Sequence, residues 1–344
     1  MTKVEDIIQK IEQFAPPHLA ENWDPIGLSI GTRQQKVNKM LVALDLDADT
    51  LEEAKAKEVD FIFTHHPAIF SSLKTLNEED PRRKEYIELI RANISLYSAH
   101  TNIDAAENGM NDWLAEAIGL KRPYDAITFS HQDTYKKLTY YAKTQGSTKQ
   151  KDLIKKELEN SPSIHYYHLN QEEMKIEMVL AEQEVPAFIQ KLYRLEAEPN
   201  YHLTTIDKKA PSYGIGRVGE LAEALTMEDL IEKVKSAYSV EHLRSSNMKV
   251  AEPIKKVAVL GGAGANYYQQ ALAQGAEVYI TGDISYHSAQ DMMRDGLAFI
   301  DPGHFIEHIF VEQMTARLNE WNESENWGIE IIPASQQEDV FTFS

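Results

Sequence analysis

The alternation of apolar and polar positions predicts strands and helices that follow one another through the first third of the chain. Apolar residues recur at helical spacing over residues 4–14, and the prolines at 16 and 17 end this helix. An ordered loop is expected at 21–28. Apolar runs predict buried strands at 39–46, 61–64 and 94–99, with helices at 50–57, 82–92 and 109–118. Strands that alternate with helices in this way indicate a mainly parallel sheet.

The same alternation returns near the C-terminus. Strands are predicted at 257–260, 278–281 and 297–301, and helices at 267–273, 285–294 and 305–321. Two α/β halves therefore flank the middle of the chain.

The middle of the chain follows a different order. Strands are predicted at 136–143, 163–169, 175–180 and 201–206, with helices at 148–158 and 185–195. This β-α-β-β-α-β order is typical of a ferredoxin-like module. We therefore predict the α/β fold class, with a three-layer α/β outer domain built from two chain halves, 1–130 and 211–344. An α+β ferredoxin-like domain is expected as an insertion at 131–210.

Composition narrows the class of protein. The 344 residues are 42% hydrophobic and 26% charged, which is ordinary for a globular protein. The first residues carry acids and no apolar run, and no stretch reaches the roughly 20 apolar residues of a membrane-spanning helix. These features predict a soluble, cytoplasmic protein without a membrane partner. The net charge of −19 argues against binding to nucleic acid, because such proteins usually present a basic stripe.

Ligand-type side chains follow three predicted strand ends. His65 and His66 leave the strand at 61–64, Asp104 follows the strand at 94–99, and His304 and Glu307 follow the strand at 297–301. Adjacent side chains at a strand end point to opposite sides, so the two histidines can each serve a different metal ion. Functional crevices lie at the carboxyl ends of strands in open α/β sheets. The chain has no cysteine, so any metal must be held by nitrogen and oxygen atoms.

Each of these residues also has a simpler explanation when taken singly. His65 can be a hydrogen-bonded core histidine, Asp104 a helix N-cap, and Glu307 a partner for a helix dipole. The convergence of three strand ends favours a site for two divalent metal ions. A bridging carboxylate is the usual way to hold two such ions about 3.5–4 Å apart.

Three further histidines lie near these motifs. We predict His100 as an acid/base group, with packing or ligand orientation as the alternative. We predict His287, near a helix start after another strand end, as an acid/base group or substrate contact. His308 is expected to point away from the site. The Gly261–Gly264 segment is interpreted as a tight strand-to-helix turn, whose backbone N–H groups could also touch a substrate phosphate.

Several motifs together resemble the Ngg-interacting-factor-three-like family, whose bacterial members carry the name "GTP cyclohydrolase 1 type 2 homologue". In chain order they are Asn22-Trp23-Asp24-Pro25-Ile26-Gly27-Leu28, Thr64-His65-His66-Pro67, His100-Thr101-Asn102-Ile103-Asp104, Gly214-Ile215-Gly216-Arg217-Val218-Gly219, Thr281-Gly282-Asp283 with Tyr286-His287, and Asp301-Pro302-Gly303-His304 with Glu307. They span nearly the whole chain outside the insertion.

The resemblance implies a dinuclear metal centre with the ligands His65, His66, Asp104, His304 and Glu307. It implies two divalent ions per chain, with zinc favoured over iron or manganese. It also implies a homohexamer that encloses a cavity, whose openings the inserted domain caps in the longer members.

Two functions follow from these observations. The first is a metal-dependent hydrolase, by resemblance a GTP cyclohydrolase, acting on a nucleotide or another small phosphate-containing ligand. The second is a metal-binding or regulatory protein without turnover, whose inserted domain binds a partner.

Overall fold

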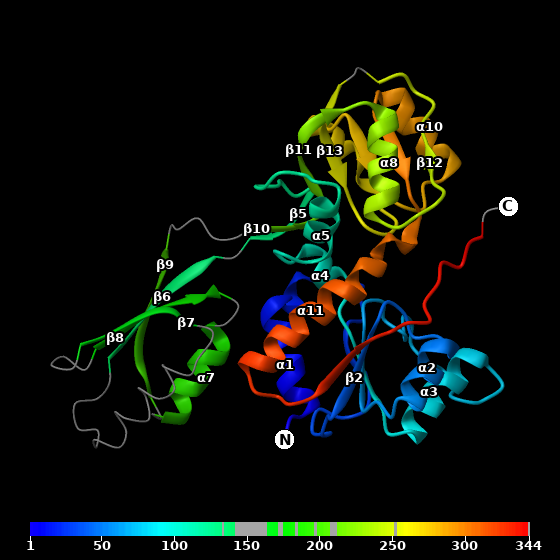
Figure 1. The fold of residues 1–344 in the computed structure, drawn as a ribbon. Coiled ribbons are helices and arrows are strands. Elements are labelled where there is room, and N and C mark those ends of the chain that lie inside the picture. The colour runs from blue at the N-terminus through cyan, green and yellow to red at the C-terminus, as the bar shows by residue number, and fades with distance from the viewer. Residues whose placement is uncertain are drawn as a thin grey trace. The chain divides into compact units, whose positions relative to one another are not determined.

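The chain divides into two compact units. Residues 1–130 and 213–344 form one unit, and residues 131–212 form the other. The computed structural model describes residues 1–132, 134–141, 164–170, 175–182, 185–195, 198–206, 212–250 and 253–342. Figure 1 shows the two sheets of the larger unit, with the N-terminal and C-terminal thirds of the chain brought together in it.

The first sheet of the larger unit has the order β1-β4-β3-β2-β16. Its strands are β1 (Gly27–Ile30), β4 (Ser95–Ser98), β3 (Phe61–Thr64), β2 (Lys39–Ala43) and β16 (Glu330–Pro333). Strand β3 runs parallel to both β2 and β4, and β16 runs parallel to β2, whereas β1 is antiparallel to β4. The carboxyl ends of β2, β3 and β4 therefore meet at one edge of the sheet.

Helices cover both faces of this sheet because its strands are apolar on both sides. Ile62 and its neighbours on one face pack against α2 (Ala48–Ala56) and α3 (Pro81–Arg91). Phe61 and Phe63 face the other way and join the core that contains α1 (Val4–Phe14). The result is a three-layer arrangement, in which the period-2 alternation of β3 assigns successive side chains to opposite layers.

The second sheet of the larger unit has the order β11-β13-β14-β15-β12. Its strands are β11 (Arg217–Leu225), β13 (Ile254–Val259), β14 (Val278–Ile280), β15 (Ala298–Asp301) and β12 (Arg244–Ser245), and its helices are α8 (Met227–Ala237), α9 (Tyr268–Ala273) and α10 (Tyr286–Asp295). Strands β13, β14 and β15 are parallel, and β11 and β12 are antiparallel to their neighbours. Both sheets confirm the predicted α/β class.

One long helix links the two halves of the larger unit. Helix α11 (Ile309–Ser324) contacts α5 (Met110–Ala117), β2 and β16, and buries Phe310, Met314 and Leu318 at helical spacing. The short helices α4 (Thr101–Ala105), η1 (Pro17–Leu19) and η3 (Ala265–Tyr267) and the strand pair β5 (Thr128–Gln132) and β10 (Ser212–Ile215) complete the connections.

Three local expectations from the sequence were wrong. The loop expected at 21–28 ends earlier, since β1 begins at Gly27 and pairs with β4. The helix expected at 305–321 begins as a 3₁₀ turn, η4 (His304–His308), before α11. Helix α8 and strands β1, β11 and β16 were absent from the prediction. Strands β1 and β16 lie at sheet edges and have four residues each, so they carry little periodic signal.

The smaller unit contains a four-stranded antiparallel sheet in the order β7-β8-β6-β9. The strands are β6 (Tyr135–Tyr141), β7 (Ile164–Asn170), β8 (Lys175–Ala181) and β9 (Asn200–Ile206), and α7 (Val185–Leu195) packs against the sheet through Phe188 and Leu192. The helix expected at 148–158 lies outside the described residues. The ferredoxin-like module therefore stays a prediction.

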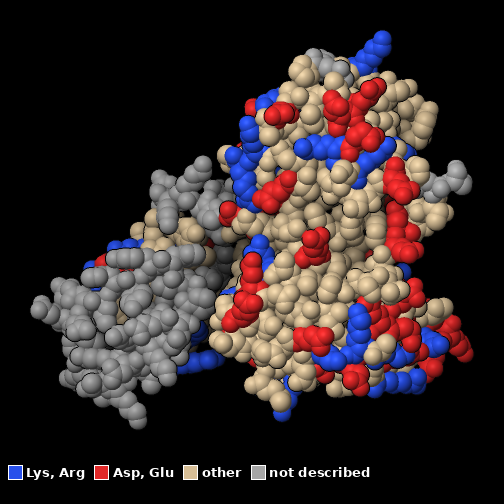
Figure 2. All heavy atoms as spheres, viewed as in Figure 1, with Lys and Arg blue, Asp and Glu red and all other residues tan. Residues whose placement is uncertain are grey.

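Two surface properties bear on possible partners. Among the residues that the structure describes, none of the helices is both long and apolar enough to cross a membrane. On the face shown in Figure 2, Lys and Arg side chains are interspersed with Asp and Glu.

Candidate metal centre

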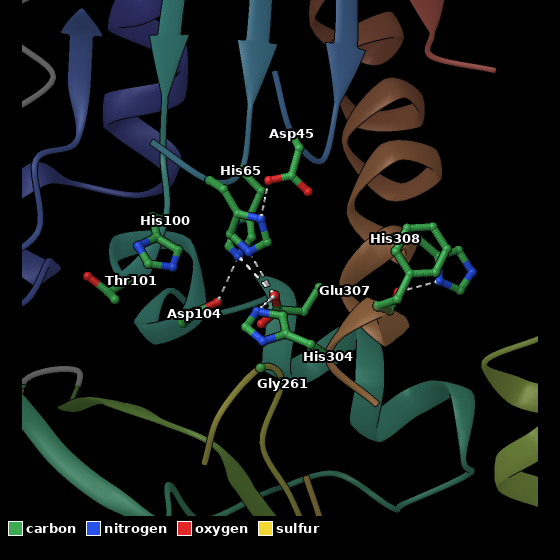
Figure 3. A network of polar contacts seen from close by, with 12 residues as sticks. Asp45, His65, His100, Thr101, Asp104, Gly261, His304, Glu307 and His308 are labelled. Atoms are coloured by element: carbon green, nitrogen blue, oxygen red, sulfur yellow. Dashed lines mark hydrogen bonds and ion pairs between the residues drawn. The ribbon is translucent and has the colours of Figure 1, made fainter. Parts of the chain in front are cut away.

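The predicted ligand residues come together where the first sheet meets the 3₁₀ turn of the second half. His65 and His66 follow β3, Asp104 lies on α4, and His304 and Glu307 lie on η4 (Figure 3). Three groups of side chains have ligand atoms within 4.8 Å of one another and could hold a metal ion. They are His65 with Asp104 and Glu307, His66 with His304 and Glu307, and His65 with His66 and His100.

Glu307 occupies the centre of this cluster. Its Oε2 atom lies 3.0 Å from Nε2 of His66, 3.1 Å from Nε2 of His304 and 3.9 Å from Nε2 of His65. The 3₁₀ conformation of η4 makes the contact between His304 and Glu307 possible, because side chains three residues apart eclipse one another in such a turn. His304 and Glu307 therefore point to the same place, as their spacing predicted.

Two buried polar atoms in the cluster have no hydrogen-bond partner in the structure. His65 is fully buried and its Nδ1 donates to the carbonyl of Ala99 (3.1 Å), which leaves Nε2 unpartnered. Oδ1 of Asp104 is equally unpartnered and lies 3.7 Å from that Nε2. Buried polar atoms without partners are costly, and a cation between an imidazole nitrogen and carboxylate oxygens would satisfy them. The donor set fits a divalent metal ion.

Three of the imidazoles each form a hydrogen bond between Nδ1 and a carboxylate. Nδ1 of His66 donates to Asp45 (2.8 Å), Nδ1 of His304 to Asp283 (2.8 Å), and Nδ1 of His100 to Asp24 (3.0 Å). Such contacts orient an imidazole and direct Nε2 toward a metal. These roles were not predicted from the sequence, although Asp45 and Asp283 each lie just beyond the end of a strand, which was the available signal.

Burial and hydrogen bonds shift the pKa values of the cluster in opposite directions. Burial disfavours the charged form of His66, but hydrogen bonds to Asp45 and Glu307 outweigh it and raise the pKa of His66 to about 10. The hydrogen bond to Glu307 is the main cause that raises the pKa of His304 to about 9. Burial opposes ionisation of Glu307 too, yet the two imidazoles hold the pKa of its carboxyl well below the usual range.

Burial is the main cause of the pKa shifts of His65 and Asp104, the pair with unpartnered atoms. Burial lowers the pKa of His65 well below its ordinary value, so this imidazole is neutral. Burial, with the nearby charge of Glu307, raises the pKa of Asp104 to about 7. A neutral imidazole with a free nitrogen is the form that binds metal ions.

The other predicted residues divide between the cluster and its surroundings. His100 packs against the cluster, with ring centroids 5.1 Å from His65 and 5.5 Å from His66. His287 is exposed on α10, where it contacts Gln290 and the ring of Tyr286, and it belongs to none of the three groups. His308 donates to the carbonyl of Phe305 and points away from Glu307, as expected (Figure 3).

The glycine turn after β13 closes the cluster on a further side. A Cβ atom on Gly261 would lie 2.8 Å from Oε1 of Glu307, and one on Gly262 would lie 2.9 Å from the same atom. Gly262 also has a φ of +59°, which few other residues adopt. The turn is tight, as predicted, and its glycines leave room for the Glu307 carboxylate.

Comparisons with known proteins show which proteins the chain is similar to. The profile of the Duf34/NIF3 (NGG1p interacting factor 3) family matches residues 2–339. The chain is 32% identical to a Streptococcus pneumoniae protein named "GTP cyclohydrolase 1 type 2 homolog", over 98% of this chain and 97% of the relative. A Bacillus subtilis protein of the same name is also 32% identical, over 98% of each chain.

Solved structures show the same fold. The structure of a Bacillus cereus protein related to NIF3 superposes with a TM-score of 0.83 at 29% identity, and covers 100% of this chain and 99% of that one. A Staphylococcus aureus protein superposes with a TM-score of 0.79 at 29% identity and the same coverage. With a family match along nearly its whole length, the chain belongs to the Duf34/NIF3 family.

Proposed function

We propose that the chain is a metal-dependent hydrolase with a dinuclear metal centre. The observation that carries the proposal is the position of Glu307, whose carboxylate belongs to two of the three groups that could hold a metal ion. One ion would be held by His65, Asp104 and Glu307, and the other by His66, His304 and Glu307. Glu307 is then the bridging carboxylate.

The donor atoms limit the choice of metal. All are imidazole nitrogens and carboxylate oxygens, since the chain has no cysteine. This set suits zinc best, with iron and manganese as alternatives. The absence of thiolates also means that the chain cannot build a Cys/His zinc site.

Two such ions, when bound, supply an activated water and polarise a carbonyl, imine or phosphoryl group. We propose His100 as the residue that moves a proton. Its Nδ1 is held by Asp24, and its ring borders His65 and His66. We assign His100 the acid/base role, and His287 a second role in substrate contact from α10.

The name of the relatives points to a nucleotide as substrate. We propose a nucleotide or another small phosphate-containing molecule, with GTP as the first compound to test. Hydrolysis of GTP and of a phosphoester panel should be assayed with zinc-loaded protein, alongside His65→Ala and the surface control Arg294→Ala. Turnover that requires His65 supports the proposal. Absence of turnover, or turnover unaffected by His65→Ala, would refute a hydrolase.

Metal content tests the dinuclear centre separately. Mass spectrometry of the purified protein should find two metal ions per chain. Glu307→Gln should reduce the affinity for both ions, whereas His304→Ala should affect one. Equal loss of metal ions in the two variants would argue against a carboxylate shared by both ions.

A second function is favoured by the separate compact unit at residues 131–212, which has its own apolar core. Here the chain binds metal without turnover and this inserted domain binds a regulatory partner. Deletion of 134–207 tests the role of the insertion, and unchanged partner capture would contradict it. We also propose a homohexamer, which light scattering of the purified protein would test.

A further inference from the structure

Two large aromatic side chains lie exposed beside the candidate metal centre. Trp23 and Phe70 are each 58% exposed, and their ring centroids are 5.8 Å apart. The indole of Trp23 meets the ring of His100 edge-on at 6.1 Å, and His100 in turn lies 5.5 Å from His66. A continuous row of rings thus leads from the surface to the proposed metal ligands.

The loop that carries Trp23 is tied to the centre by hydrogen bonds. The next residue, Asp24, accepts from Nδ1 of His100 (3.0 Å) and from the backbone N–H of Thr101 (3.0 Å). The backbone N–H of Glu21 donates to the hydroxyl of Thr101 (2.9 Å). Trp23 is therefore held in place from both sides, with its ring left open to solvent.

Phe70 is held in a similar way by the residues before it. Ala68 and Ile69 pack against the apolar core below α2 and α3, and the carbonyl of Ala68 accepts from the hydroxyl of Tyr86 (2.5 Å). Phe70 follows directly and turns outward. Aromatic rings usually bury most of their surface, so two anchored and exposed rings in contact form a surface suited to a ligand.

We propose that Trp23 and Phe70 form a stacking platform for a planar heteroaromatic ring of the substrate, such as a nucleobase. The polar end of the same molecule would then reach the cluster around Glu307. This inference rests on the proposed function and specifies its substrate class. Since every nucleobase has a π-face, the platform selects for ring-bearing ligands and discriminates little between bases.

The test compares two phosphate-containing ligands, one with a nucleobase and one without it. Zinc-loaded, full-length protein is titrated calorimetrically with guanosine 5′-monophosphate and with ribose 5-phosphate. We expect the nucleotide to bind more tightly. Trp23→Leu and Phe70→Leu should each weaken nucleotide binding about 5- to 150-fold, the usual range for one base–aromatic stack, and leave the binding of ribose 5-phosphate unchanged. Trp23→Phe should restore part of the loss.

The control variant is Tyr193→Leu, which removes a ring of similar exposure (54%) from α7 and should change neither affinity. Equal affinity of the wild-type protein for both ligands would overturn the platform. A Trp23→Leu variant that weakens the binding of both ligands equally would also overturn it. So would a Trp23→Leu variant that changes only the molar mass of the protein in solution, because the two rings would then contact a second copy of the chain.

The same titrations separate this inference from the proposed function. Binding of ribose 5-phosphate that survives removal of the metal would count against the metal centre as the polar subsite. The difference in affinity between the two ligands would still show whether Trp23 and Phe70 bind the nucleobase.

Discussion

Nδ1 of His66 lies 2.8 Å from Oδ1 of Asp45, and this contact turns the other nitrogen of the imidazole toward Glu307. Asp45 follows β2 and His66 follows the adjacent parallel strand β3, so the contact joins the carboxyl ends of two neighbouring strands. A carboxylate behind a metal-binding imidazole sets its orientation and raises its basicity.

Asp45→Asn should therefore weaken metal binding by about 10- to 100-fold without unfolding the protein. The measurement is zinc affinity by competition with a chelator. Asp49→Asn, which changes an exposed acid on α2, serves as the control. Unchanged affinity in Asp45→Asn would show that His66 needs no support from this carboxylate.

Gly261→Ala should lower metal content while the fold persists. The new Cβ would lie 2.8 Å from Oε1 of Glu307 and 3.1 Å from a methyl group of Leu114, so the carboxylate must move. Metal stoichiometry and circular dichroism measure the two effects. Gly219→Ala is the control, because its nearest neighbour is a Tyr124 ring atom at 3.2 Å, away from the cluster. Full metal content in Gly261→Ala would contradict the tight fit.

The stability of the metal-free protein should fall as the pH rises above neutrality. The pKa values of His66 (about 10) and His304 (about 9) are raised from 6.5, so the folded state holds these protons more tightly than the unfolded state. Their contribution is complete below pH 6.5 and is lost as the pH rises through 9 to 10.

Zinc should reverse this trend, because the imidazoles must lose their protons to bind a metal. Thermal unfolding of chelated and zinc-loaded protein from pH 6.5 to 9 should show a Tm difference that widens with pH. The slope for the chelated protein should be shallower in His66→Gln. A Tm difference independent of pH would exclude these imidazoles as ligands.

Arg217 joins the two halves of the larger unit. Its buried guanidinium donates to Asp112 on α5 and to backbone carbonyls that include that of Ala106 (3.1 Å). Arg217→Met removes the nearer cation of the buried Asp112, leaves only Arg122 at 3.8 Å, and should lower the free energy of unfolding by about 3–5 kcal/mol. Arg294→Met removes the exposed pair with Asp291 (2.7 Å) and should cost less than about 1 kcal/mol. Urea denaturation measures both, and similar losses would contradict the prediction.

Hydrophobic periodicity alone determined much of this protein. The apolar run from Phe61 to Phe63 predicted a buried strand, and the spacing of apolar residues predicted α1 and α11 to within a few residues. These signals are local, because burial of one face of an element imposes its period on the sequence. The same patterns predicted which strand ends carry the ligand-type residues.

The tertiary structure decided how those residues meet. His66 and Glu307 are 241 positions apart, and only the packing of the two halves brings them within 3.0 Å. The same packing brings Asp45 into contact with Nδ1 of His66 and pairs β16 with β2 in the first sheet. It leaves His287 exposed and outside the cluster. Periodicity shows which face of an element is buried, whereas contacts between distant residues depend on how the elements pack. The sequence therefore determined the candidate ligands, and the fold determined that Glu307 lies between them.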